Sequence, residues 1–349
     1  MITLLGPAWR GGALALLAAV LFGVSTPLVQ FFGTGAGTFT TAALLYAGAA
    51  VMGALLRRPV EVEAQLRRGD VGRLLAMASF GAVIGPVALA WGLQRTSGTS
   101  ASLMLSLEAF FTVILARGLY RETMGRRVWV AMLLLLCGGV VLVLDQGRLG
   151  AYQLAGLSAV LLATAAWGVD NTLSRRVADR DPGQVVLAKS TLGACATGLI
   201  ALAVQEPIPK LSAVLGLLAV GAIGYGLSLR FYLLAQRAFG AARTGSVFAF
   251  APFIGALLAF ALGERSAGVL MAGGGVLMLL GAVLHLVETH THGHRHEPMD
   301  HEHAHQHDDG HHNHVHDPMP KGAHSHGHHH EPLRHAHPHV PDAHHLHSH

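Results

Sequence analysis

The first 284 residues of this 349-residue chain contain no histidine, although the whole chain has 25. Charged residues are also scarce, at 13% of the chain, where soluble domains carry about 25%. These two shortages argue against an imidazole-based metal centre in that part of the chain and against a water-exposed surface. The net charge is +4 and the basic residues lie in short loops, so no nucleic-acid partner is indicated.

Cysteine is nearly absent too, with only Cys137 and Cys195. Both lie within apolar blocks, and we interpret them as small buried side chains rather than as a disulfide or a metal-binding pair. The chain also lacks the G-x-x-x-x-G-K-[ST] sequence that binds nucleotide phosphates. Energy from nucleotide hydrolysis is therefore not indicated.

Long apolar blocks take the place of the missing charges. Hydrophobic residues make up 52% of the chain, in blocks of about 20 residues, which is the length that a helix needs to cross a bilayer. The sequence therefore predicts an all-α membrane protein, surrounded by lipid, with ten transmembrane helices. The predicted helices cover residues 11–31, 37–56, 73–93, 98–118, 127–144, 153–173, 183–204, 211–234, 241–262 and 267–287.

Arginine and lysine are distributed unevenly between the loops. Fifteen arginines fall on one side of the ten predicted helices, and four basic residues fall on the other. Positively charged loops stay in the cytoplasm. We therefore expect a multi-pass protein of the cell (inner) membrane with both termini in the cytoplasm.

One stretch of the sequence occurs twice, at a shift of 142 residues. Ten helices in two copies of five give a first repeat at 1–144 and a second at 145–287. Because five is an odd number, the second copy crosses the membrane in the opposite direction, as in many secondary transporters. The shift places Gln94 on Gln236, Arg95 on Arg237, Gly98 on Gly240, Ala109 on Ala251, Phe111 on Phe253 and Glu122 on Glu264.

Two motifs accompany the repeats. LFGVSTPL at 21–28 matches AWGVDNTL at 166–173, and the fourth helix of each copy carries A-x-x-x-S…(E/P)-x-F…E. Over 11–287 the chain resembles the EamA-type branch of the drug/metabolite transporter superfamily, which implies two five-helix repeats and solute transport rather than enzymatic activity. Where that family often has a proline in the fourth helix, this chain has Glu108-Ala109-Phe110, while the second copy keeps Pro252.

Glu108 lies ten residues from either end of its predicted helix, about 15 Å below the membrane surface. An ionisable group at that depth costs at least a few kcal/mol. We predict that Glu108 faces a central cavity and binds a proton or a cation, with Met104 and Thr112 one turn away. The alternative is a protonated acid with a structural role only.

Asp170 and Lys189 lie nearer the cytoplasmic edge, at similar depth on consecutive predicted helices. They form either a structural ion pair or, together with Asn171, part of the inner mouth of the cavity. Gln30 and Trp91 are further candidates for the cavity lining. Helix packing or an interfacial position explains these two residues equally well.

From residue 288 onward the composition changes, and 288–349 holds 24 of the 25 histidines. The histidines alternate with small or acidic residues and leave no apolar face, so we predict a disordered cytoplasmic tail. Neutral imidazole binds Ni²⁺, Co²⁺ and Zn²⁺, and we predict that the tail binds these ions while no cofactor is tightly bound. A low-complexity polyelectrolyte is the alternative. The predicted ligands are His290, His292, His294, His296, His301, His303, His305, His307, His311, His312, His314, His316, His324, His326, His328, His329 and His330.

These features together favour proton-coupled efflux of a divalent transition metal, Ni²⁺ or Co²⁺, with the tail buffering or delivering ions. Branches of the superfamily that the chain resembles are associated with nickel and cobalt resistance. Two alternatives stay open. One is an exporter of an organic metabolite such as an amino acid, with the tail as an incidental metal buffer. The other is a metal store or sensor anchored to a vestigial transporter. The sequence also leaves a homodimer open.

Overall fold

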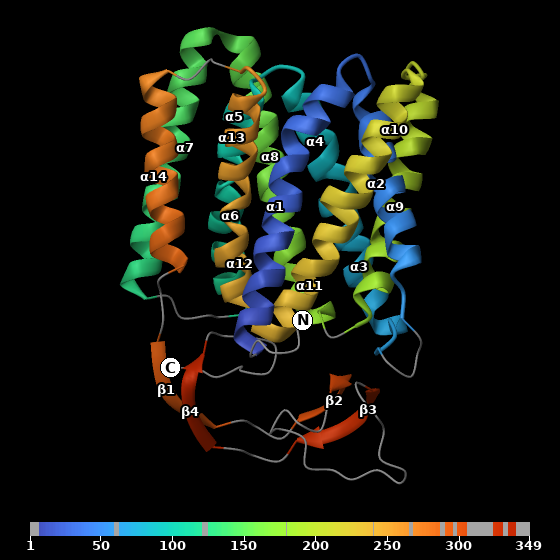
Figure 1. Ribbon diagram of the computed structural model, residues 1–349, viewed down its shortest axis with the longest axis vertical. Helices are drawn as coiled ribbons and strands as arrows, with labels where there is room; N and C mark the ends of the chain where they lie inside the picture. The colour runs from blue at the N-terminus through green and yellow to red at the C-terminus, as the bar shows by residue number, and fades with distance from the viewer. Residues whose placement is uncertain are drawn as a thin grey trace.

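The computed structural model describes residues 7–58, 63–120, 125–178, 180–239, 241–264, 268–286, 290–295, 299–305, 324–330 and 334–339. Within these residues, ten apolar segments stand side by side in one bundle (Figure 1). Nine of them are long and apolar enough to cross a membrane, and the tenth, Val269–Leu284, is shorter. The predicted all-helical membrane architecture is therefore confirmed.

The helices follow the predicted segments closely, and the bundle contains both repeats. The first repeat consists of α1 (Pro7–Gly33), α2 (Thr38–Leu55), η1 (Arg68–Asp70), α3 (Val71–Met77), η2 (Ala78–Ile84), α4 (Gly85–Leu93), α5 (Gly98–Met104), α6 (Leu107–Tyr120) and α7 (Arg126–Leu149). The second consists of α8 (Ala151–Ser174), η3 (Arg175–Val177), α9 (Pro182–Ala203), α10 (Leu211–Val220), η4 (Gly221–Leu227), α11 (Ser228–Phe239), α12 (Ala241–Phe248), α13 (Ala251–Ala261) and α14 (Val269–Leu286).

Two kinds of irregularity occur in both repeats. The third and eighth transmembrane segments each contain a π-helical turn, η2 and η4, at equivalent positions. The fourth and ninth segments are each interrupted in the middle, at 105–106 between α5 and α6 and at 249–250 between α12 and α13. Single continuous helices were expected over 98–118 and 241–262. Broken helices are a common way for transporters to place polar backbone and side chains at the level of the membrane centre.

Glycines let neighbouring helices approach closely. A Cβ on Gly221 would overlap the backbone carbonyl of Leu45 in α2, whereas a Cβ on Gly273 in α14 would meet no atom within 4 Å.

We expect Gly221→Ala to lower the free energy of unfolding by about 1–3 kcal/mol, because the carbonyl of Leu45 cannot move without the rest of α2. Gly273→Ala is the matched control and should be neutral or slightly stabilising. Thermal unfolding of the detergent-solubilised variants measures both effects, and equal midpoints would contradict the close packing.

The two cysteines differ from the interpretation given above. Cys137 and Cys195 are both free, as expected, but both are exposed on the surface of the bundle rather than buried. In a membrane this surface faces lipid, which is as apolar as a protein core. Apolar sequence around a residue therefore does not distinguish the interior from the lipid-facing side.

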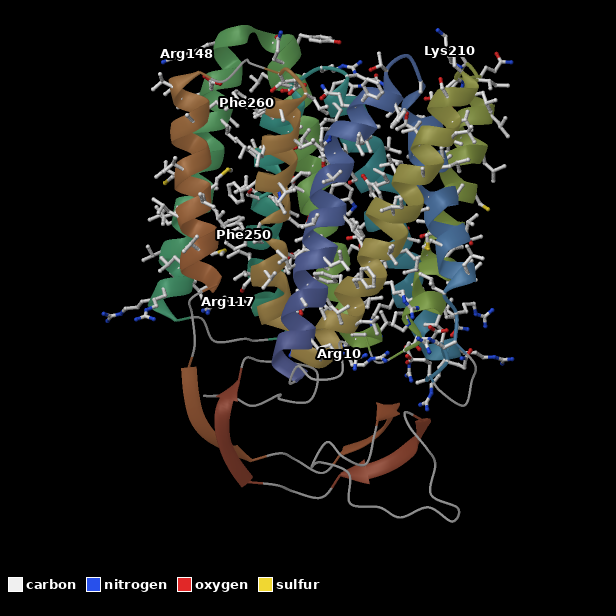
Figure 2. All side chains as sticks on the ribbon, in the orientation of Figure 1. Arg10, Arg117, Arg148, Lys210, Phe250 and Phe260 are labelled. Carbon is white, nitrogen blue, oxygen red and sulfur yellow. The ribbon has the colours of Figure 1, made fainter. Side chains whose placement is uncertain are left out.

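The two ends of the bundle differ in charge. Figure 2 shows Arg10 and Arg117 at one end, and Arg148 and Lys210 at the other. We call the first the arginine-rich end and the second the far end. Two ion pairs tie segments together at the arginine-rich end, Arg237 to Glu63 (2.8 Å) and Arg180 to Asp70 (3.2 Å).

Part of the tail has regular backbone structure. β1 (His290–Arg295) pairs with β4 (Arg334–His339), and β2 (Met299–His305) pairs with β3 (His324–His330), both antiparallel. These strands differ from the disordered tail predicted above, because alternation of histidine with other residues also matches the two-residue period of a strand. Figure 1 shows them beyond one end of the helical bundle. Six predicted ligands lie outside the described residues: His296, His307, His311, His312, His314 and His316.

Candidate functional site

Glu108 lies at the interruption of the fourth transmembrane segment, in the first turn of α6. At the interruption the backbone forms i→i−3 hydrogen bonds in place of the usual i→i−4 bonds. They run from Ser106 N to Leu103 O and from Glu108 N to Leu105 O, both at 3.0 Å. The side chain of Glu108 is buried, with 8% of the residue exposed. A carboxylate in the first turn of a helix is stabilised by the partial positive charge of the helix N-terminus. The interruption therefore gives this buried acid a favourable local field.

The second repeat supplies the direct partner of Glu108. Asn171 in α8 donates a hydrogen bond from Nδ2 to Oε1 of Glu108. One residue on, the hydroxyl of Thr172 donates to the backbone oxygen of Thr112 in α6 (3.4 Å). The structure thus brings the predicted residues Glu108, Asn171 and Thr112 to one contact between α6 and α8. Met104, also predicted, is fully buried at the end of α5, on the other side of the interruption.

Asp170 and Lys189 form a buried ion pair between α8 and α9, at 4% and 2% exposure. Oδ2 of Asp170 accepts the bond from Lys189, while Oδ1 has no hydrogen-bond partner among the described residues. The pair packs against Gly81, where an added Cβ would overlap both side chains. Since Gly81 lies about halfway along the third transmembrane segment, the pair reaches deeper into the membrane than the cytoplasmic edge at which the sequence placed it.

The π-helical turn η2 explains why Gly81 attracts polar side chains. The N–H of Gly85 donates to Phe80 O, five residues back, and the next residue is Pro86, which has no N–H to offer the carbonyl of Gly81. That carbonyl instead accepts bonds from the hydroxyl of Tyr46 and from Nε1 of Trp167 (2.9 Å). Both side chains were missed by the sequence analysis, although Pro86 was a usable signal for a displaced backbone bond.

Aromatic rings from both repeats pack around this level. Phe22 contacts Trp167, Tyr225 and Phe248 with ring centroids 5.5, 5.7 and 5.3 Å apart. Tyr46 contacts Tyr225 at 5.6 Å. The hydroxyl of Tyr225 is buried and has no hydrogen-bond partner in the described part of the chain. We call these five residues the aromatic cluster.

Two predicted cavity residues lie elsewhere. Nε2 of Gln30 donates to Leu93 O and Thr96 O, both at 3.3 Å, and so holds the loop at the far end. Trp91 is 36% exposed, and the guanidinium of Arg95 lies 3.6 Å from its ring centroid. Neither residue is brought to Glu108. Both belong to contacts that pack or anchor the far end of the bundle.

Among the described residues, no group of three or more histidine, cysteine, aspartate or glutamate side chains is arranged to hold a metal ion. In the tail, the backbone register places His301, His303 and His305 opposite His328, His326 and His324. The membrane bundle therefore offers carboxylates and amides as ligands, and the imidazoles belong to the tail.

Two five-helix repeats with interrupted helices at the level of a buried acid define a membrane transporter. Comparison with known families agrees, because the model of the EamA-like transporter family matches residues 9–144 and again 154–287. The chain belongs to this family. It is a multi-pass membrane protein whose transmembrane part consists of two copies of the family's unit.

Two known relatives are also named as transporters, and neither name states a substrate. The chain is 26% identical over 289 residues to an uncharacterized transporter of Methanothermobacter thermautotrophicus, covering 76% of this chain and 83% of the relative. It is 24% identical over 201 residues to the uncharacterized transporter YyaM of Bacillus subtilis, covering 55% and 65%. A solved structure titled "Crystal structure of protein" matches with a TM-score of 0.59 at 19% identity, over 78% of this chain and 96% of that one, which shows the fold alone.

Proposed function

We propose that this chain is a proton-coupled secondary transporter in which Glu108 carries the exchanged proton or cargo. The observation that supports it is the placement of one buried carboxylate at an interrupted helix, hydrogen-bonded to Asn171 of the opposite repeat. Motion of one repeat against the other changes the surroundings of Glu108 directly. A carboxylate binds either a proton or a cation, and this competition couples the two fluxes.

The proposed cargo is a divalent transition metal, Ni²⁺ or Co²⁺, moved out of the cell. Support comes from the 24 histidines after residue 287 and from the described strands of the tail, which lie beyond the arginine-rich end that we take as cytoplasmic. Outward movement of a 2+ ion against an inside-negative potential costs about 4.6 kcal/mol per 100 mV, at about 2.3 kcal/mol per charge. An inward proton gradient supplies this energy, and the tail raises the ion concentration at the inner mouth.

Removal of residues 288–349 tests the role of the tail. We expect the shortened chain to keep its thermal unfolding midpoint, because the described strands of the tail lie outside the helical bundle. It should lose nearly all high-capacity Ni²⁺ binding measured by calorimetry. Cells that express it should accumulate several-fold more Ni²⁺ than cells with the full chain. Unchanged accumulation would remove the tail from the transport mechanism.

A second cargo, an organic ammonium compound such as an amino acid, is favoured by the ion pair and the rings. The ammonium group of Lys189 is buried beside Asp170 and opposes the entry of a 2+ ion. The aromatic cluster suits an organic cation, because ring faces attract ammonium groups.

Thermal stabilisation of the shortened chain separates the two cargoes. Ni²⁺ alone should raise the unfolding midpoint of a metal exporter, and amino acids alone should raise that of a metabolite exporter.

A further inference from the structure

Two carboxylates at the far end of the bundle are presented by the same helix-ending turn. Glu206 follows α9 and Glu264 follows α13, and in each case the preceding residue has a positive φ, 55° at Gln205 and 105° at Gly263. The N–H of each glutamate donates to the carbonyl five residues earlier, at 3.0 and 3.2 Å. This turn satisfies the last carbonyls of the helix and fixes the direction of the chain that follows. Both carboxylates are therefore held in place by their own helix.

Each carboxylate receives the first N–H groups of a helix in the other repeat. Oε1 of Glu264 accepts from Gly98 N (3.0 Å), and Oε2 accepts from Thr99 N (2.9 Å) and from the Thr99 hydroxyl (3.2 Å). Glu206 makes the same three bonds to Phe39 and Thr40 at the start of α2, at 3.1, 2.7 and 2.8 Å. The N–H groups at a helix start have no partner within the helix, and negative charge is favourable there.

The two helices held in this way differ in one respect. α2 is continuous over Thr38–Leu55, whereas α5 is a half-helix that ends at the interruption before Glu108. A continuous helix keeps its position through contacts along its whole length. α5 continues into α6 only through the turn at 105–106, and its start is held by packing against α13 and by the bonds to Glu264.

The packing of α5 against α13 leaves polar groups unsatisfied. Ser102 is 0% exposed and faces Gly255, where an added Cβ would lie 2.8 Å from the Ser102 hydroxyl oxygen. Among the described residues, the hydroxyls of Ser102 and Ser106 have no hydrogen-bond partner. A buried hydroxyl without a partner is unfavourable, and water would satisfy it. The closed contact between α5 and α13 is therefore disfavoured in its middle and held at its end by Glu264.

We propose that Glu264 is a gating residue. Its bonds to Gly98 and Thr99 hold α5 against α13 and close the path from the far-end solution to Glu108. Release of these bonds lets α5 move away from α13, and water then reaches Ser102. This inference goes beyond the proposed function, because it does not depend on the cargo or on the coupling ion. It assigns different roles to two glutamates with the same local geometry, since Glu206 caps a helix that does not move.

Cysteine labelling of the purified full-length chain tests the gate without a substrate. Cys137 and Cys195 are replaced by serine, and Ser102→Cys supplies the only thiol. In this background we compare Glu264→Gln and Glu264→Ala with the matched variant Glu206→Ala, using the rate of reaction with a water-soluble maleimide. Loss of charge-assisted hydrogen bonds to Gly98 and Thr99 should make the introduced thiol react about tenfold faster or more in both Glu264 variants. Glu206→Ala should leave the rate within about twofold, because Glu206 bonds the start of α2 and not α5.

The thermal unfolding midpoint of each variant separates gating from unfolding. Faster labelling of the introduced thiol at a midpoint near that of the parent supports the gate. Unchanged labelling in both Glu264 variants overturns it, and so does an equal acceleration in Glu206→Ala, which would show general loosening of the far end. If Glu264→Ala does not fold, Glu264→Gln decides, because glutamine keeps the shape and loses the charge.

Discussion

Replacement of Glu108 by glutamine should reduce coupled export by about tenfold or more. A cation bound to a carboxylate gains a charge-assisted interaction worth about 1.5–3 kcal/mol that an amide does not provide, and each 1.36 kcal/mol is a factor of ten. Glutamine can still form a hydrogen bond with Asn171, so the fold should be kept. Export from proteoliposomes, measured with and without an imposed proton gradient, shows the effect. The gradient should accelerate the wild-type chain and leave Glu108→Gln unchanged.

Glu206→Gln is the matched control for this experiment. It makes the same chemical change at a carboxylate of the other repeat, at the far end of the bundle, where it caps α2 rather than facing Asn171. It should export at nearly the wild-type rate. If Glu108→Gln kept both the rate and the response to the gradient, the carboxylate would have no part in coupling, and a structural role would explain its burial.

Lys189→Met should produce the largest loss of stability. It leaves Asp170 charged and unpaired at 4% exposure, and the loss of one partner of a buried ion pair costs about 3–5 kcal/mol. Thermal unfolding in detergent measures the loss. Asp170→Leu with Lys189→Met removes both charges at matched shape and should recover most of the stability. If Lys189→Met alone unfolded at the wild-type temperature, water would reach Asp170. That result would contradict the burial of the ion pair.

Much of the fold could be predicted because a bilayer imposes simple rules. Helix length follows from membrane thickness, and an odd number of helices per repeat forces the second copy to be inverted. The predicted segment 183–204 agrees within a residue with α9 (Pro182–Ala203). The EamA-like family, inferred from two motifs, was confirmed over both repeats.

The site could be predicted only in part. Glu108, Asp170 and Lys189 were found because charge in hydrocarbon needs a partner, and the structure supplies Asn171 for the first and pairs the other two. Tyr46 and Trp167 were missed because their partner is a backbone carbonyl, and only a displaced helical bond makes it available. The sequence also does not show which side of an apolar helix faces lipid and which faces protein, as the exposed Cys137 and Cys195 demonstrate.

The π-helical turn η2 has a consequence for the whole of α4. A wide turn of this kind amounts to one additional residue in the helical count, and one residue rotates everything beyond it by about 100° around the axis. The sides of α4 that face lipid and protein are thus set by a turn that ends just before the helix begins. Loss of one residue within Ala78–Ile84 would swing Leu89, now fully buried, toward the acyl chains. A single codon deletion there would remodel one wall of the transporter while leaving its hydropathy profile almost the same.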